Sequence, residues 1–221
     1  MLWGDSFAAC IYPGLRALTD GRALDARLAQ FTAPLCPPLP KTSEGQLIEC
    51  EAMNRIAVEQ VRIHRPSTVL LAGAWMTYQR SDDDRGREIR GLSVTVRELK
   101  AMGVERVVVV GSLPVWQTAQ PRLLLSLWRQ NGEVPNRLLD GMAPRLLASE
   151  ARVEGIARQA GAEFISPMRL LCTDQGCETT VERGGTLYPL AHDEAHLTNE
   201  GSRRLALAML DQLRHGPVAK R

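Results

Sequence analysis

The sequence lacks any apolar run that approaches the roughly 20 residues needed to cross a bilayer. Its first residues also lack the basic region, apolar core and cleavage site of a secretory leader. We therefore expect the chain, as printed, to fold in water rather than within a membrane.

The sequence also has little net charge. Its 27 Lys and Arg nearly balance its 25 Asp and Glu, and the net charge is +2. No basic segment is dense enough to predict a nucleic-acid surface, so we expect neither DNA nor RNA as a partner. Glycine-rich phosphate motifs and clustered metal-ligand spacings are absent too, and we predict no cofactor and no metal. The acidic run at residues 81–85 is typical of a solvated loop rather than of a divalent-metal site.

What is present is enough sequence for one packed domain, which we predict over residues 1–221 with 216–221 as a frayed tail. Apolar segments typical of buried strands alternate with segments of helical periodicity. The predicted strands are 67–72, 104–110 and 163–165, and the predicted helices are 8–29, 43–64, 87–102, 123–129, 144–160 and 199–214. This alternation predicts an α/β fold with a mainly parallel central sheet and helices on both faces.

The most informative motif is Gly4-Asp5-Ser6, which follows a short apolar start and precedes small residues that open a helix. Such a turn places a serine hydroxyl beside the backbone N–H groups of a helix start, where an oxyanion would find donors. The same residue types are favoured in turns and helix caps, so a capping role for Ser6 stays open. Only three residues precede the motif, and we expect a truncated first strand, either a stub or a remnant of a longer protein.

A second motif lies near the other end, where Asp193 and His196 are three residues apart before the last predicted helix. A serine nucleophile needs a base, and the base needs a carboxylate that holds its tautomer. The spacing lets the carboxylate reach one ring nitrogen while the other faces the serine. An acidic loop whose histidine only contacts the helix is the alternative, and His192 is the rival base.

Five cysteines leave at least one thiol unpaired. A short polar loop containing a glycine separates Cys172 from Cys177, which favours a local disulfide over two unrelated thiols. Cys36, in a proline-rich segment, is a candidate partner of Cys50, and we expect Cys10 to be a buried apolar residue. Two disulfides would indicate an oxidising compartment.

Together these motifs resemble the SGNH (GDSL-type) hydrolase and acyltransferase superfamily, and in detail the SGNH domains fused to or partnered with membrane acyltransferase-3 proteins. The segments that carry the resemblance are LWGDS at 2–6, VLLAGAW at 69–75, LPVW at 113–116, the Cys172/Cys177 pair, and HLT at 196–198 with GS at 201–202. The resemblance implies a three-layer α/β/α fold of SGNH or flavodoxin-like type, a catalytic Ser6, His196 and Asp193, and a periplasmic or other extracytoplasmic location.

The sequence departs from the superfamily at Trp75, which stands about where many relatives carry an asparagine that donates to the oxyanion. No glycine of the family's second motif is evident either, so we expect the oxyanion hole to rest on backbone N–H groups, chiefly that of Ser6. The loops after two strands should border the pocket. There Trp75, Tyr78 and Trp116 are predicted to offer a sugar an apolar platform, unless the rings pack in the core.

We predict a serine-dependent O-acyltransferase or esterase that acts on acetyl groups of bacterial cell-surface carbohydrates through an acyl-serine intermediate. The expected partners are an acylated carbohydrate or polysaccharide and a membrane acyltransferase-3 domain. The alternative is a catalytically weak module that binds carbohydrate and presents it to that membrane partner.

Overall fold

A computed structural model describes residues 1–39, 48–79 and 87–215, and its centre is a five-stranded parallel sheet. The strands lie in the order β2-β1-β3-β4-β6. Their bounds are Leu2–Gly4 for β1, Gln30–Thr32 for β2, Thr68–Ala72 for β3, Arg106–Val110 for β4 and Glu163–Ile165 for β6. The predicted helix start at 43–47, the acidic loop at 81–85 and the tail at 216–221 lie outside the described residues.

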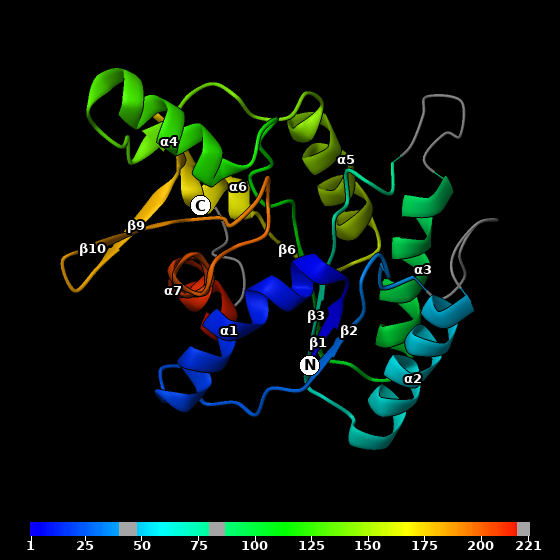
Figure 1. Ribbon diagram of the computed structural model, residues 1–221. Coiled ribbons are helices and arrows are strands. Elements are labelled where there is room, and N and C mark those ends of the chain that lie inside the picture. Colours follow the sequence, from blue (N-terminus) through cyan, green and yellow to red (C-terminus); the bar gives the residue numbers. More distant parts are fainter. Residues whose placement is uncertain (40–47, 80–86, 216–221) are drawn as a thin grey trace, which may run out of the picture.

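Helices cover both faces of this sheet, as Figure 1 shows. One face carries α1 (Ser6–Asp20) and α7 (Asn199–His215), which run side by side. The other carries α2 (Ile48–His64), α3 (Arg87–Ala101) and α5 (Leu146–Gln159). The predicted three-layer α/β/α fold is confirmed.

The sheet is apolar on both faces because both are covered. Along β3, Val69 and Leu71 pack toward α2, α3 and α5, whereas Leu70 and Ala72 pack toward α1 and α7. Successive strand residues point to opposite faces, so a strand buried on both sides reads as a continuous apolar run. This is why the strands at 67–72 and 104–110 were recognisable in the sequence.

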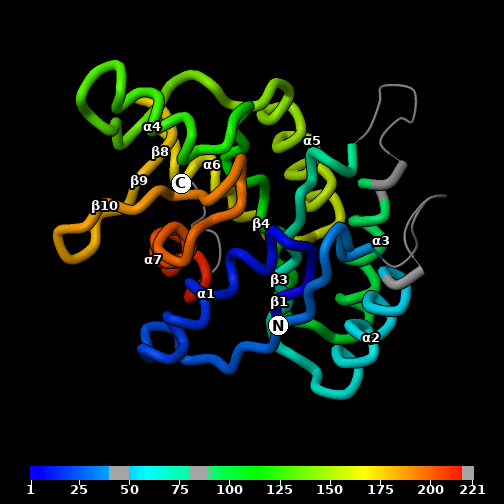
Figure 2. The backbone as a smooth tube through the Cα atoms, viewed as in Figure 1, coloured from blue at the N-terminus to red at the C-terminus, as the bar shows by residue number. Residues whose placement is uncertain are grey.

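Outside the main sheet lie two small antiparallel sheets that the sequence did not predict. One contains β5 (Arg137–Leu138), β8 (Gly176–Glu178) and β7 (Cys172–Thr173), and the other pairs β9 (Thr180–Arg183) with β10 (Thr186–Pro189). Figure 2 traces the β9–β10 hairpin as it projects beside α7. These strands have two to four residues, too few for a period-two pattern to stand out. The remaining helices are α4 (Gln120–Asn131) and α6 (Pro167–Leu171).

Both predicted disulfides are present. Cys172 and Cys177 face each other across β7 and β8, and Cys36–Cys50 joins the segment after β2 to α2. Cys10 is the free thiol among the described residues and is half-buried, and burial raises its pKa to about 12. It therefore stays a protonated, unreactive side chain at neutral pH.

The predicted helix at 8–29 is wrong in its second half. The helix ends at Asp20, where Gly21 caps it, and the chain then forms the edge strand β2 at 30–32. This strand is only partly buried, so it lacks the apolar run that marks the central strands. None of the helices in the described ranges is both long and apolar enough to span a membrane.

The contact between α1 and α7 is unusually close at Gly14. A Cβ there would overlap the backbone carbonyl oxygen of Ser202 in α7. The Gly14 N–H donates to the Ser202 hydroxyl at 2.8 Å, and that hydroxyl donates to the carbonyl of Ile11 at 3.0 Å. A glycine in a helix costs stability by itself, and here it lets two helices approach to hydrogen-bonding distance.

Gly14→Ala should therefore lower the free energy of unfolding by about 1–3 kcal/mol, because the added methyl group forces two backbones apart. Chemical denaturation of the purified chain measures this. Gly155→Ala in α5 is the matched control, because a Cβ at Gly155 meets open space. It should raise stability by about 0.5–1 kcal/mol, and equal effects of the two substitutions would contradict the close-contact argument.

Candidate active site

Ser6 is the first residue of α1, directly after β1 and the helix cap Asp5. Strand β1 lies between β2 and β3, so the chain order of the sheet reverses at this point. In open α/β sheets such a switch point, at the carboxyl ends of the strands, is where ligands bind. The turn requires Gly4, because a Cβ there would overlap the carbonyl of Ala72 in β3.

His196 bridges Ser6 and Asp193. Its Nε2 lies 2.8 Å from the Ser6 Oγ, and its Nδ1 lies 2.7 Å from the Asp193 Oδ2. Because a carboxylate only accepts, the Nδ1 carries the proton and the Nε2 is free to accept from the serine hydroxyl. The structure thus brings together the three residues that the sequence singled out as catalytic candidates.

The Asp193 carboxylate is itself held in place. Partial burial acts to raise its pKa, but hydrogen bonds from the backbone N–H groups of Ala195 and His196 and from the His196 ring outweigh burial and keep the pKa below its ordinary value. The carboxyl group therefore stays ionised beside the imidazole, as an orienting group must.

The loop that carries Asp193 is fastened to the start of α4. The Gln120 N–H donates to the Asp193 carbonyl at 2.9 Å, and the Gln120 Oε1 accepts from the Ala191 N–H at 2.7 Å. The Trp116 N–H donates to the Glu194 carbonyl at 2.8 Å. Gln120 is fully buried, and no sequence signal identified this role.

His192, the rival base, occupies a different place. Its side chain is 61% exposed, and its ring stacks on that of His196 with centroids 5.8 Å apart. Its Nε2 is 3.8 Å from the Asp193 Oδ2, beyond hydrogen-bonding distance. Of the two histidines, His196 is the one hydrogen-bonded to Ser6.

Asp5 joins the serine turn to the loop after β3. It is fully buried and accepts hydrogen bonds from the N–H of Phe7 at 2.8 Å, the N–H of Ala74 at 2.8 Å and the hydroxyl of Tyr78 at 2.6 Å. Burial raises its pKa, and the three donors act against that shift. The interaction fixes Ser6 relative to the strand beside it.

Trp75, Tyr78 and Trp116 pack in the core, which is the alternative to the sugar platform that the sequence left open. The three side chains are 0%, 8% and 2% exposed, so none presents a ring face to a sugar. The Trp75 Nε1 donates to the Val110 carbonyl at 2.7 Å, and the Trp116 ring packs with Met168. Burying large ring surfaces is favourable, and here the rings close the end of the core beneath the site.

The Ser6 backbone N–H has no hydrogen-bond partner among the described residues, so it is available to a ligand oxygen. The N–H of Gly73, the residue after β3, likewise has no hydrogen-bond partner within residues 1–39, 48–79 and 87–215. Asn54, the other amide considered from the sequence, is structural. It accepts from the Trp3 Nε1 at 2.9 Å and donates to the Leu39 carbonyl at 2.6 Å.

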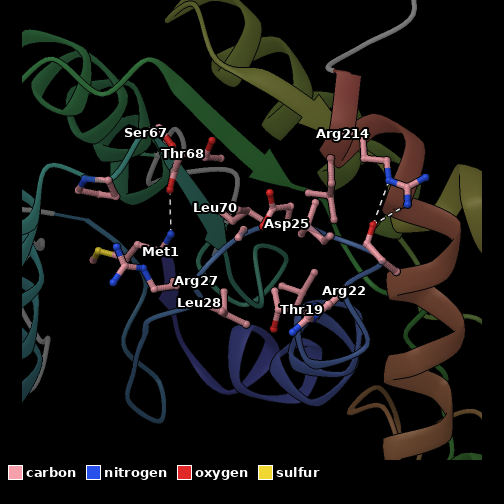
Figure 3. A pocket seen from close by; sticks show the side chains of 16 residues that line it. Met1, Thr19, Arg22, Asp25, Arg27, Leu28, Ser67, Thr68, Leu70 and Arg214 are labelled. Carbon is pink, nitrogen blue, oxygen red and sulfur yellow. Dashed lines mark hydrogen bonds between the residues drawn. The ribbon is translucent and has the colours of Figure 1, made fainter.

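A cavity of about 670 Å³ lies at the end of the sheet where the strands begin. Figure 3 shows its lining. It is lined by Met1 and Thr68, at the amino ends of β1 and β3, and by Arg214 of α7. The Met1 amino group donates to the Thr68 carbonyl at 2.8 Å. Ser6 follows the carboxyl end of β1, so this cavity is separate from the candidate active site.

A parallel α/β/α sandwich with a serine after the first strand and an Asp-x-x-His turn before the last helix is the architecture of the SGNH class. The family model described as "SGNH domain (fused to AT3 domains)" matches residues 1–211, and the chain belongs to this family. No curated protein matches the sequence significantly.

Solved structures with the same fold include the periplasmic domain of the lipopolysaccharide acetyltransferase of Salmonella ser. Paratyphi A. It is 23% identical with a TM-score of 0.81, over 96% of this chain and 83% of that one. A peptidoglycan O-acetylesterase is 13% identical with a TM-score of 0.53, over 83% of this chain and 44% of that one. At these identities the likeness establishes the fold.

Tyr78→Phe should lower the free energy of unfolding by about 1.5–3 kcal/mol at neutral pH, because the buried Asp5 carboxylate loses a charge-assisted hydrogen bond. The phenol lowers the pKa of Asp5, so its removal raises that pKa further. The loss should shrink as the pH falls through the folded-state pKa of Asp5, where the carboxyl group is protonated.

Urea denaturation at several pH values tests this. Tyr188→Phe is the control, because Tyr188 lies partly exposed on β10. A loss that does not vary with pH would show that Tyr78 acts through packing alone.

Proposed function

We propose that this domain is a serine-dependent acyl-transfer enzyme. The observation that supports it best is the continuous hydrogen-bonded chain from Asp193 through His196 to Ser6. It has the order and atom assignments that nucleophilic catalysis at a serine requires.

In the proposed mechanism the Ser6 Oγ attacks the carbonyl carbon of an acyl ester while the His196 Nε2 takes the hydroxyl proton. Asp193 stabilises the imidazolium that results. Collapse of the tetrahedral intermediate returns that proton to the departing alkoxide oxygen and leaves an acyl-serine. An incoming hydroxyl group then gives its proton to His196 as its oxygen attacks the acyl carbon, and His196 returns that proton to the Ser6 Oγ as the acyl group leaves.

The oxyanion of that intermediate is stabilised chiefly by the Ser6 N–H at the start of α1, where the helix dipole adds to the hydrogen bond. In the sequence Trp75 stands about where many relatives carry a side-chain donor, and its ring is buried. Loss of one such donor costs roughly 100-fold or more in rate. We therefore expect slow turnover of simple esters.

We propose that the substrates are O-acetyl groups on carbohydrates of the bacterial cell envelope and that a membrane acyltransferase-3 domain is the partner. Three facts support this: the family occurs fused to AT3 domains, one structural relative above is a lipopolysaccharide acetyltransferase, and the other is a peptidoglycan O-acetylesterase. The two disulfides favour an extracytoplasmic location.

The alternative is a catalytically weak carbohydrate-binding module. The replacement of the asparagine donor by Trp75 favours it, since that change slows chemistry. The burial of Trp75 and Trp116 counts against it, because the aromatic surface that would have held a sugar is inside the core. We therefore favour the enzyme.

Ser6→Ala should abolish labelling by a fluorophosphonate and lower acyl-ester turnover by roughly 1,000-fold or more. His196→Ala and Asp193→Ala should each lose much of the same activity, and combining either with Ser6→Ala should add little, because the three residues act as a unit. Intact-protein mass and aryl acetate hydrolysis measure these effects.

Labelling on a serine other than Ser6 would refute the assignment. So would losses of activity that are additive when the substitutions are combined. A collapse of activity in His192→Ala with His196→Ala still active would instead identify the wrong histidine.

We expect the acyl-serine to pass its acetyl group to a carbohydrate hydroxyl faster than to water, since a sugar held in near-attack geometry outweighs the concentration of water. An activated acetyl ester is supplied with candidate oligosaccharides, and mass spectrometry follows acetylated sugar while acetate is assayed. Free acetate as the sole product, with rapid deacetylation of an acetylated glycan, would make the domain an esterase.

A further inference from the structure

A cluster of metal-binding groups, which the sequence did not single out as a metal site, overlaps the proposed active site. One ring nitrogen of His192, one of His196 and a carboxylate oxygen of Asp193 lie within 4.8 Å of one another. The two histidines are four residues apart on the turn before α7, and the carboxylate belongs to the residue after the first of them. Two imidazoles and a carboxylate are a ligand set that suits Zn²⁺.

The distances are close to what a shared zinc ion needs. The Asp193 Oδ2 is 2.7 Å from the His196 Nδ1 and 3.8 Å from the His192 Nε2. Tetrahedral zinc with bonds of about 2.0–2.2 Å holds its ligand atoms roughly 3.3 Å apart. The first of these pairs must open and the second close by roughly half an ångström. The two histidine nitrogens lie within 4.8 Å of each other and must reach the same spacing, to which rotation of the His192 side chain contributes.

Access also favours binding. The His192 side chain is 61% exposed, and its Nε2 already lies 3.8 Å from the Asp193 Oδ2 while its ring stacks on that of His196. His196 and Asp193 are each about one-third exposed, at 31% and 34%. The fourth zinc position can be taken by water, as in sites that three protein ligands form.

We propose that His192, Asp193 and His196 form an inhibitory zinc site. The His196 Nε2 faces Ser6, so the Nδ1 is the nitrogen turned toward Asp193 and the metal. A neutral imidazole carries one proton. When zinc takes the Nδ1 lone pair, that proton resides on Nε2, which then cannot accept the proton of Ser6.

Inhibition by zinc rests on the proposed function, but zinc binding does not. His192 is the residue that separates the two, because it touches the metal without touching Ser6. His192→Ala should keep the activity of the metal-free protein. It should weaken zinc inhibition by at least about tenfold, since even outer partners of a metal site contribute that much to affinity.

The experiment uses the untagged chain after dialysis against a chelator. Zn²⁺ is titrated during aryl acetate hydrolysis by the unaltered chain and by His192→Ala, with Mg²⁺ as a cation that prefers oxygen ligands. Separately, Co²⁺ is titrated and its visible absorption recorded, which needs no catalysis. His64→Ala, far from this turn in the sequence, is the matched histidine control.

Zinc inhibition and a cobalt spectrum that both weaken in His192→Ala, and not in His64→Ala, are expected. Equal zinc sensitivity with and without His192, equal inhibition by Mg²⁺, or no cobalt binding to the unaltered chain would each overturn the proposal. A chain that hydrolyses no ester yet gives the His192-dependent cobalt spectrum would refute the proposed function and leave the metal site standing.

Discussion

The packing of α1 against α7 is the constraint on which the candidate site depends. Ser6 begins one helix and His196 lies three residues before the start of the other, and 190 positions of sequence separate them. Their 2.8 Å contact exists because the two helices lie side by side on one face of the sheet, in register at Gly14 and Ser202. A shift of one helix along the other would separate the base from the hydroxyl.

The sequence predicted those parts of the molecule that short segments determine. Gly4-Asp5-Ser6 and Asp193–His196 are local patterns, and the central strands are continuous apolar runs, so the catalytic candidates and the three-layer fold could be inferred. Cys172 and Cys177 are close in sequence, which made their pairing predictable. The edge strand β2 and the two small sheets were missed, because short or half-exposed strands have no distinctive pattern.

The remaining parts of the site depend on contacts between distant segments. Asp5 meets Tyr78 across 73 residues, and Gln120 meets Ala191 across 71, and neither pairing has a local signature. The aromatic residues after β3 and β4 illustrate the same limit. Their position at strand ends could be inferred, but whether a ring points outward or into the core depends on the packing around it.

Asp5 has one more consequence, which concerns the electric field at the serine. A carboxylate one residue away from a developing oxyanion would oppose it, because like charges at short range repel strongly when little water lies between them. Three donors surround this carboxylate, and their N–H and O–H dipoles oppose its field. The repulsion that the Gly-Asp-Ser sequence would otherwise place beside its own nucleophile is thereby reduced, so the same residue can cap the helix and brace the turn without opposing the charge that forms at Ser6.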